Sequence, residues 1–157
     1  MIEKPSEENA FHARHIELLL DSLEQLTGKS PVPRLDDTAT AKVVWEAPFA
    51  LVSHGVEDDP IFNYGNLKAL ELFEMNWESF TKLPSRLSAE AANRAEREVL
   101  LEKVNQDGFI NDYSGVRISA TGRRFHIENV LIWNISDKEE EPCGQAALFS
   151  DWGYLDG

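Results

Sequence analysis

The chain has 157 residues, of which 42% are hydrophobic and 27% are charged, and it contains four Trp. This composition predicts one folded domain with its own core, and it excludes a disordered tail or a low-complexity linker. Fifteen Lys and Arg stand against 28 Asp and Glu, which gives a formal net charge of −13. Such a surface repels phosphate backbones and anionic headgroups, so we expect no nucleic acid and no membrane surface as a direct partner.

The single cysteine, Cys143, cannot form an internal disulfide or a cysteine-rich zinc site. Residues 1–8 are acidic and lack the apolar centre of a signal peptide. No window of the sequence approaches the roughly 18 consecutive apolar residues of a membrane-spanning helix. We therefore expect a cytoplasmic protein.

The first predicted element is an amphipathic helix over residues 7–27. Ser6 precedes it, and Gly28 stands where a left-handed C-cap is favoured. Apolar side chains recur at steps of three and four residues and form one stripe, made of Ile16, Leu19, Leu20, Leu23 and Leu26. This stripe must be covered, either by the rest of the chain or by a second copy.

Residues 29–40 carry two prolines and two aspartates, a composition that suits neither a helix nor a central strand. We interpret this segment as a connector. The chain is then divided into an N-terminal helical arm with its connector, residues 1–40, and a main domain, residues 41–157.

The middle of the chain predicts a hairpin followed by helices. Strands at 49–54 and 61–64 flank an acidic turn. Helices are expected at 67–74, capped by Asn66, and in a short segment after Asn76 that ends before Pro84. A longer helix over 89–106 carries a favourably ordered pair, Glu90 and Arg94, and ends at Gly108. Its predicted apolar stripe consists of Ala92, Ala95, Val99, Leu100 and Val104.

The last third of the chain changes to the periodicity of strands. Strands are predicted at 113–121, 124–135 and 142–152, separated by Gly122 and by an acidic turn over 137–141. Strict alternation in the second of these strands puts one set of apolar residues on a single face, namely Phe125, Ile127, Leu131, Trp133 and Ile135. The predicted fold is α+β, with a five-stranded antiparallel sheet, connecting helices and the N-terminal amphipathic helix.

Two strands, a few helices and three strands are also the element order of the PAS fold. Residues 59–74 resemble a PAS entry, with a strand, an asparagine and a helix. Four further segments resemble the MEKHLA domain, a PAS-like family, at residues 83–86, 113–119, 122–125 and 144–147. The family occurs as free-standing bacterial proteins and at the C-terminal end of plant class III homeodomain-leucine zipper transcription factors. The chain resembles the bacterial type, because it has no homeodomain, basic region or zipper heptads.

This resemblance implies a sensory or regulatory module with no catalytic residues to carry across. In PAS-like domains the helices and the inner sheet face enclose a small-molecule site, and the flanking N-terminal helix often mediates dimerisation. We therefore expect a module that binds a small organic ligand or a protein effector, and that forms a homodimer through the helix over residues 7–27.

Polar side chains on the inner sheet face are the candidates for a ligand site, because a buried amide without a partner costs about 1–3 kcal/mol. Asn129 is the strongest candidate for a ligand-binding residue, since alternation places it on the same face as Ile127 and Leu131. Aromatic side chains supply walls, and a guanidinium can clamp a carboxylate. The predicted ligand-binding residues are Asn129, Asn63, Gln145, Trp133, Trp77, Tyr113 and Arg117. Two alternatives stay open: the polar groups satisfy one another, or Arg117 and Arg86 form structural salt bridges.

Histidines keep a second class of function open. His54 and His126 each stand near carboxylates, so the alternative is a small-molecule isomerase or lyase on a cone-shaped α+β fold. No nucleophile is spaced to complete a triad. His12 and His15 stand three residues apart but lack a third local ligand, so we predict no metal site.

The cofactors of PAS relatives are disfavoured. Haem-binding members usually take their axial histidine from the helices after the second strand, and residues 67–106 contain no His. Flavin photoreceptor members need a cysteine in that region, whereas Cys143 lies at the final strand. The cofactor is left unassigned, and the open alternatives are a freely exchanging organic acid or aromatic molecule, or a filled core without ligand.

Overall fold

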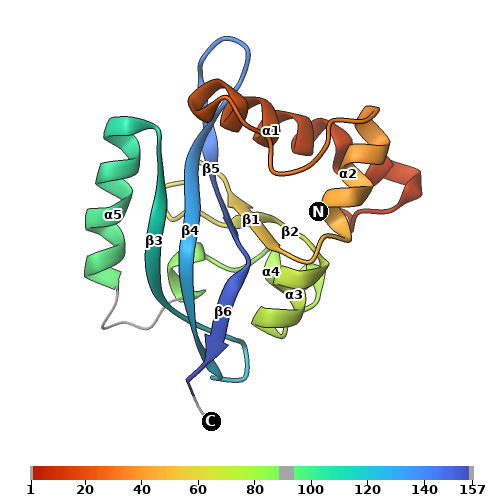
Figure 1. The fold of residues 1–157 in the computed structure, drawn as a ribbon. Coiled ribbons are helices and arrows are strands. Elements are labelled where there is room, and N and C mark those ends of the chain that lie inside the picture. The colour runs from red at the N-terminus through yellow and green to blue at the C-terminus, as the bar shows by residue number, and fades with distance from the viewer. Residues whose placement is uncertain (1, 89–93, 156–157) are drawn as a thin grey trace.

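The computed structural model describes residues 2–88 and 94–155. Within them the chain forms one six-stranded antiparallel sheet in the order β2-β1-β5-β4-β3, and β6 follows β5 along the other half of β4 (Figure 1). The strands are β1 (Ala50–His54), β2 (Phe62–Gly65), β3 (Phe109–Ile118), β4 (Arg124–Ser136), β5 (Pro142–Phe149) and β6 (Asp151–Tyr154). The predicted α+β fold with an antiparallel sheet is confirmed.

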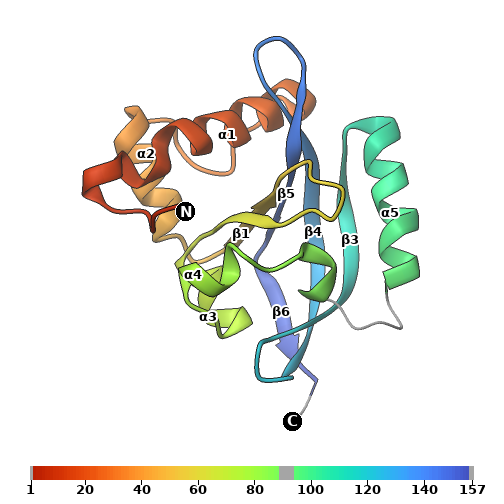
Figure 2. The same cartoon turned by 180° about the vertical axis from the view of Figure 1, so that it is seen from behind.

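Helical segments cover both faces of this sheet. They are η1 (Glu7–His12), α1 (Ala13–Thr27), α2 (Asp37–Trp45), α3 (Leu67–Phe73), α4 (Trp77–Phe80), η2 (Ser85–Ser88) and α5 (Arg94–Asp107). Figure 1 shows α1 in front of the upper strands, and Figure 2 shows α3 and α4 from the opposite side. Two neighbouring residues of β4 mark the two faces. Trp133 donates from Nε1 to Leu19 O of α1 at 3.0 Å, while Asn134 donates from Nδ2 to Val104 O of α5 at 3.3 Å.

The predicted helix over residues 7–27 is divided in two. Ala10, Phe11 and His12 have φ values of 54°, 54° and 59°, which end the 3-10 turn η1 and let α1 begin at Ala13. Gly28 ends α1 in the left-handed conformation, as predicted. Four members of the apolar stripe are buried on the sheet of the same chain, Ile16, Leu19, Leu20 and Leu23. The stripe is therefore covered without a second copy, and the physical reason for expecting a dimer through it no longer holds.

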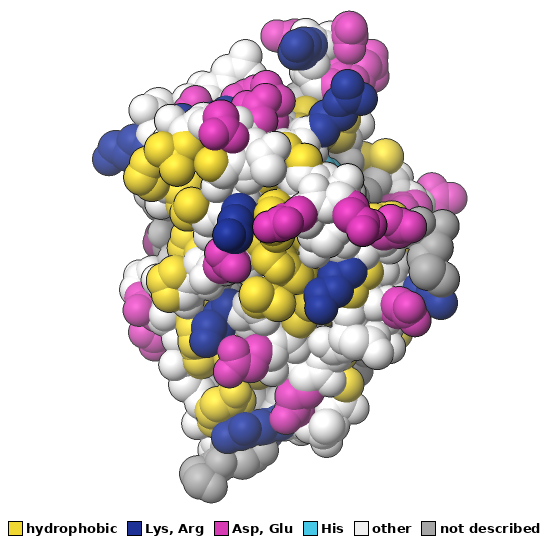
Figure 3. All heavy atoms as spheres, turned by 90° about the vertical axis from the view of Figure 1, so that its right-hand side faces the viewer, with side chains coloured by type: hydrophobic (Ala, Val, Ile, Leu, Met, Phe, Trp, Pro, Cys, Tyr) yellow, Lys and Arg dark blue, Asp and Glu magenta, His cyan; other side chains and the backbone are white. Residues whose placement is uncertain are grey.

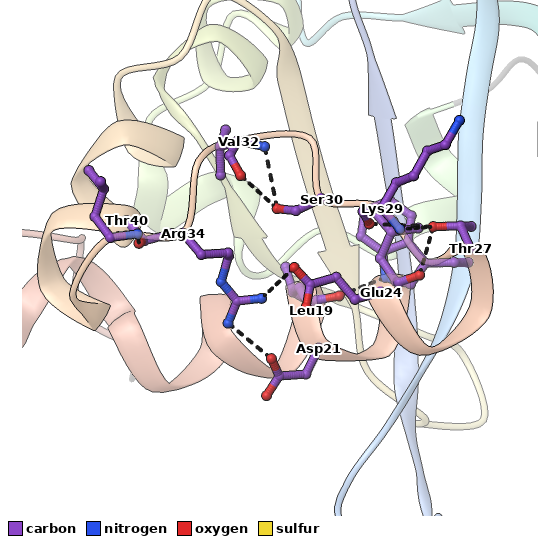
Figure 4. A network of polar contacts seen from close by, with 12 residues as sticks. Leu19, Asp21, Glu24, Thr27, Lys29, Ser30, Val32, Arg34 and Thr40 are labelled. Atoms are coloured by element: carbon purple, nitrogen blue, oxygen red, sulfur yellow. Dashed lines mark hydrogen bonds and ion pairs between the residues drawn. The ribbon is translucent and has the colours of Figure 1, made fainter.

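The predicted connector is shorter than expected, because α2 begins inside it. Asp36 accepts a hydrogen bond from Ala39 N at 2.9 Å and caps the helix, so the aspartates belong to a helix start. The remaining connector is fastened to α1 by Arg34, which pairs with Asp21 at 3.0 Å and with Glu24 at 3.1 Å (Figure 4). The proposed division at residue 40 thus falls within α2.

A β-bulge in β4 corrects the predicted alternation. Asn129 has a φ of 54°, and the register with β3 gains one residue of β4 between Ile127 and Val130. Phe125 and Ile127 therefore share a face with Val130 and Ile132. The other members of the predicted set lie on the α1 face, Leu131, Trp133 and Ile135. Placing all five predicted residues on one face was wrong.

The hairpin, α3 and α4 are confirmed, and Asn66 caps α3 through a hydrogen bond from Ala69 N. Gly108 ends α5 with a φ of 87°. Val104 of the predicted α5 stripe is fully buried, but Val99 is 60% exposed and does not belong to it. Glu90 and Ala92 lie outside the described residues, as do the side chains of Arg94 and Ala95.

The side of the molecule formed by α2, α3 and the adjacent end of α1 carries mixed charge. Figure 3 shows acidic and basic side chains interspersed there, with hydrophobic side chains between them. The net charge of −13 is therefore not gathered into one patch on this side. Among the described helices, none combines the length and the apolar character needed to cross a membrane.

Candidate functional site

A cavity of about 60 Å³ lies between the sheet and the helices on the face opposite α1. The five strands β1 to β5 contribute to its wall, and η2, α3 and α5 close it through Ser88, Phe73 and Leu100. Most of the lining is apolar, including Val52, Phe62, Val130, Ile132 and Phe149. A concave, mostly apolar space with a few polar groups is the usual form of a small-molecule site.

Gln145 brings an amide to this wall. Its side chain is only 8% exposed, and its Nε2 donates to Asn134 Oδ1 at 3.0 Å. Asn134 in turn donates to the carbonyl oxygen of Val104 at the C-terminal end of α5. The amide chain therefore joins β5, β4 and α5, and it fixes the orientation of Gln145 beside the cavity.

Arg117 brings a guanidinium to the same wall. Its Nη1 donates to Tyr113 Oη at 3.2 Å and to Val116 O at 2.9 Å, and the group lies 5.4 Å from the centre of the Tyr113 ring. Both acceptors are neutral. Tyr113 thus positions Arg117 and does not itself line the cavity.

His54 also lines the wall, next to a close approach of β1 and β5. Its Nδ1 lies 2.9 Å from Gly55 O. On the facing strand, a Cβ atom on Gly144 would come within 1.9 Å of His54 O, and Gly144 has a φ of 142°. Only glycine fits at this position, and it lets β5 pack directly against the end of β1.

Of the seven predicted ligand-binding residues, the structure brings Gln145 and Arg117 to the cavity, with Tyr113 behind Arg117. Asn129 is exposed and donates to Asp151 Oδ2 at 3.0 Å, because the bulge turns it away from the inner face. Trp133 is fully buried on the α1 face. Placing Asn129 and Trp133 on the inner face was therefore wrong.

Asn63 and Trp77 belong to a second polar cluster, between β1, β2 and the N-terminal helices. Asn63 is an extra residue where the register of β2 with β1 shifts, and its Oδ1 accepts from Ser53 Oγ at 2.5 Å. Ser53 Oγ also lies 2.9 Å from His15 Nε2. Since the single hydroxyl proton goes to Asn63, neutral His15 donates from Nε2 to Ser53.

Aromatic rings enclose this second cluster. Tyr64 is completely buried and lies 5.8 Å from both the His15 and Trp77 rings. Among the described residues nothing bonds to its hydroxyl, and burial raises the pKa of Tyr64. Burial, followed by the charge of His12, lowers the pKa of His15 to about 4. The imidazole is therefore neutral at neutral pH.

Sequence reasoning identified His54 only as a candidate base, and it missed Ser88, Leu100 and the apolar wall. His54 shares the face of Gln145 because the two residues stand opposite each other in the β1–β5 pairing, which joins strands far apart in the sequence. The positions of Ser88 and Leu100 depend on how η2 and α5 fold back over the sheet, which no local pattern shows.

The residues do not fit the cofactors or the catalytic alternative considered above. Cys143 is the second residue of β5 and does not line the cavity, and about 60 Å³ is too small for a haem or a flavin. In the described part of the chain, no three His, Cys, Asp or Glu gather as a metal site would require. His126 lies 3.4 Å from Glu128 in a different hollow from His54. The isomerase or lyase alternative finds no support.

Residues 13–154 match the MEKHLA domain. Similar curated proteins are the rice (Oryza sativa) homeobox-leucine zipper proteins HOX32, 20% identical over 117 residues, and HOX9, 21% identical over 122 residues. These matches cover 74% and 76% of this chain but only 14% of each relative. The chain therefore corresponds to a small part of those plant proteins.

Solved structures show the fold. A PAS domain from Colwellia psychrerythraea has a TM-score of 0.62 at 14% identity, covering 70% of this chain and 91% of that one. A PAS domain of a two-component sensor histidine kinase has a TM-score of 0.56 at 18% identity, covering 72% and 90%. The light-state dimer of the fungal blue-light photoreceptor Vivid has a TM-score of 0.60 at 10% identity, covering 85% and 90%. The described chain thus has a PAS-like fold.

Proposed function

This chain belongs to the MEKHLA domain family, and we propose that it is a cytoplasmic sensory or regulatory module that binds a small organic molecule in the cavity beside Gln145. The observation that supports this proposal is the arrangement of the two sheet faces. In the strands that form the cavity wall, residues adjacent in sequence to cavity-lining residues form hydrogen bonds with α1. A structural change at the cavity therefore also alters the contacts of the sheet with α1.

Two pairs of neighbours connect the faces. On β1, Ser53 bonds to His15 in α1, and the next residue, His54, lines the cavity. On β4, Trp133 donates to α1 while Ile132 lines the cavity. Successive side chains of a strand point to opposite faces, so a ligand that moves the cavity side of β1 or β4 also moves the contact with α1.

The mechanism is a shift between two packings of α1 on the sheet. A ligand favours one packing only by binding it more tightly than the other. The packing described here buries the apolar stripe of α1 on its own sheet, so another packing offers part of that stripe to a second copy or to a protein effector. A homodimer through α1 is accordingly a ligand-dependent state in this proposal.

The test is native mass spectrometry of the freshly purified full chain, combined with thermal shift against a metabolite library. A ligand at 100 times its dissociation constant adds about 2.7 kcal/mol, which raises the melting temperature of a domain of this size by about 5–10 °C. Ala147→Leu fills the cavity and should abolish the shift. Thr38→Leu adds the same side chain at an exposed site on α2 and should preserve it. Absence of any retained or stabilising molecule would refute the proposal.

A further inference from the structure

The guanidinium on the cavity wall differs from two other arginines of the chain in having no acidic partner among the described residues. Arg34 pairs with Asp21 and Glu24, and Arg86 Nε lies 3.0 and 3.2 Å from the two carboxylate oxygens of Asp59. No described carboxylate lies within ion-pair distance of Arg117, although the chain contains 28 acidic residues.

The hydrogen bonds of Arg117 leave one edge of its guanidinium open. Both protein acceptors, Tyr113 Oη and Val116 O, are bonded to Nη1. A guanidinium has five N–H donors, so the three on Nε and Nη2 have no acceptor among the described protein groups. These two nitrogens form the fork that holds a carboxylate by two parallel hydrogen bonds.

The cavity that Arg117 lines is apolar and small. Val130, Ile132 and Phe149 contribute to its wall. The cavity of about 60 Å³ is less than half the volume of an apolar cavity of roughly 150 Å³ that binds benzene. It therefore accommodates a tail of about three carbon atoms, and an aromatic acid is too large.

We propose that the ligand is a short aliphatic monocarboxylate, with its carboxylate on the Nε and Nη2 edge of Arg117 and its tail between Val130, Ile132 and Phe149. This inference rests on the proposed ligand-binding function and names the chemical class that the site selects. Tyr113 bonds to Nη1 and its ring lies 5.4 Å from the guanidinium, so Tyr113 restrains Arg117 while Nε and Nη2 keep their donors for the ligand.

The experiment is isothermal titration calorimetry of the full chain at pH 7.5 and constant ionic strength, with sodium propionate, sodium butyrate, sodium hexanoate and neutral butyramide as probes. We expect butyrate to bind at least about tenfold more tightly than butyramide, because hydrogen bonds to a charged group are the stronger ones. Hexanoate should bind no more tightly than butyrate, because the cavity has no room for the longer tail.

Variants assign the effect to one side chain. Arg117→Gln should weaken butyrate binding at least about tenfold and leave butyramide within about twofold. Arg117→Lys keeps the charge but loses the fork, so butyrate affinity should fall between those of the wild type and Arg117→Gln. Arg86→Gln removes a paired surface arginine and should change neither affinity. Circular dichroism of each variant verifies that it is folded.

Equal binding of butyrate and butyramide, or unchanged butyrate binding in Arg117→Gln, overturns the carboxylate inference and leaves the ligand-binding function standing. If no acid binds but native mass spectrometry finds a retained molecule of another class, the carboxylate inference is again overturned and the ligand-binding function stands. If no molecule of any class binds, both the inference and the proposed function are overturned.

Discussion

His15 makes the contact between α1 and the sheet sensitive to pH. Its folded-state pKa of about 4 lies below the ordinary value of 6.5, because the imidazole is buried between α1 and β1. The unfolded chain therefore binds more protons than the folded chain between these two values, and stability falls as pH drops from about 6.5 to about 4. At neutral pH the imidazole is uncharged in the folded and the unfolded chain, so His15 does not lower the free energy of unfolding there.

The magnitude follows from the pKa difference. Each unit corresponds to about 1.4 kcal/mol, so the full difference amounts to about 3 kcal/mol below pH 4. Part of the ring borders an open hollow lined by Asn9, His12 and Arg14, so solvent reduces this to between about 1 and 3 kcal/mol. A loss of this size is a large fraction of the stability of a typical domain.

The assay is urea unfolding between pH 7.5 and pH 4.5 for the wild type and for His15→Gln. Glutamine keeps a neutral donor toward Ser53 and does not titrate. The acidic side chains titrate in both proteins, so their contribution cancels in the difference between the two curves. We expect the wild type to lose about 1 kcal/mol relative to the variant by pH 5.5 and about 2 kcal/mol by pH 4.5.

The matched control is His126→Gln, because the His126 side chain is 37% exposed and lies at a surface hollow away from α1. Because this variant keeps His15, it should retain the loss of stability that the wild type shows relative to His15→Gln. If the wild type and His15→Gln give parallel curves, then His15 is not buried as a neutral ring in solution, and the described docking of α1 is incorrect.

Two further substitutions, with a third as a control, test the backbone and polar contacts that shape the sheet. Gly144→Ala should destabilise the fold by more than about 2 kcal/mol in urea unfolding, because its Cβ meets His54 O at 1.9 Å; stability within 1 kcal/mol of the wild type would contradict this close approach. Asn66→Ala should cost at least about 3 kcal/mol, since Asn66 is fully buried and hydrogen-bonds to Leu51 N and three other backbone groups. Asn76→Ala removes only an exposed cap and should cost about 1 kcal/mol, so equal losses at the two positions would refute the buried network.

The fold could be predicted from the sequence where the chemistry is local. Asn66 and Asn76 precede their helices as N-caps, and Gly28 and Gly108 end theirs with positive φ values, so these boundaries depend on neighbouring residues alone. The start of α2 carried the same kind of signal in Asp36, but the nearby prolines led to its interpretation as a connector.

The face of each β4 residue could not be predicted by counting alternate positions. A bulge adds one residue, and one extra residue exchanges the two faces for the rest of the strand. Asn129 tolerates the left-handed conformation better than most residues, and with the preceding Glu128 it interrupts the apolar residues between Ile127 and Trp133. This pair of polar residues was the available sign of a bulge.

The same reasoning explains which site residues were found. Gln145 lies in a part of β5 that pairs with β1 and β4 without a register shift. Arg117 comes after the two register shifts in β3 and pairs with Phe125. Both residues therefore lie on the inner face. Asn63 stands at a register shift, which places its side chain against Ser53 in the second cluster. A strand pattern thus assigns a residue to a face only as far as the next bulge.

The cavity and the His15 cluster are linked by thermodynamics if α1 moves as proposed. Protonation of His15 and a ligand that loosens α1 both favour the alternative packing. Proton binding therefore strengthens ligand binding, and ligand binding strengthens proton binding, by the same free energy. Loosening would therefore raise the folded-state pKa of His15 toward 6.5, and acidification toward pH 5.5 would strengthen ligand binding in the wild type but not in His15→Gln. A ligand that instead tightens α1 reverses both signs. Identical pH dependence of affinity in the two proteins would mean that the two sheet faces act independently.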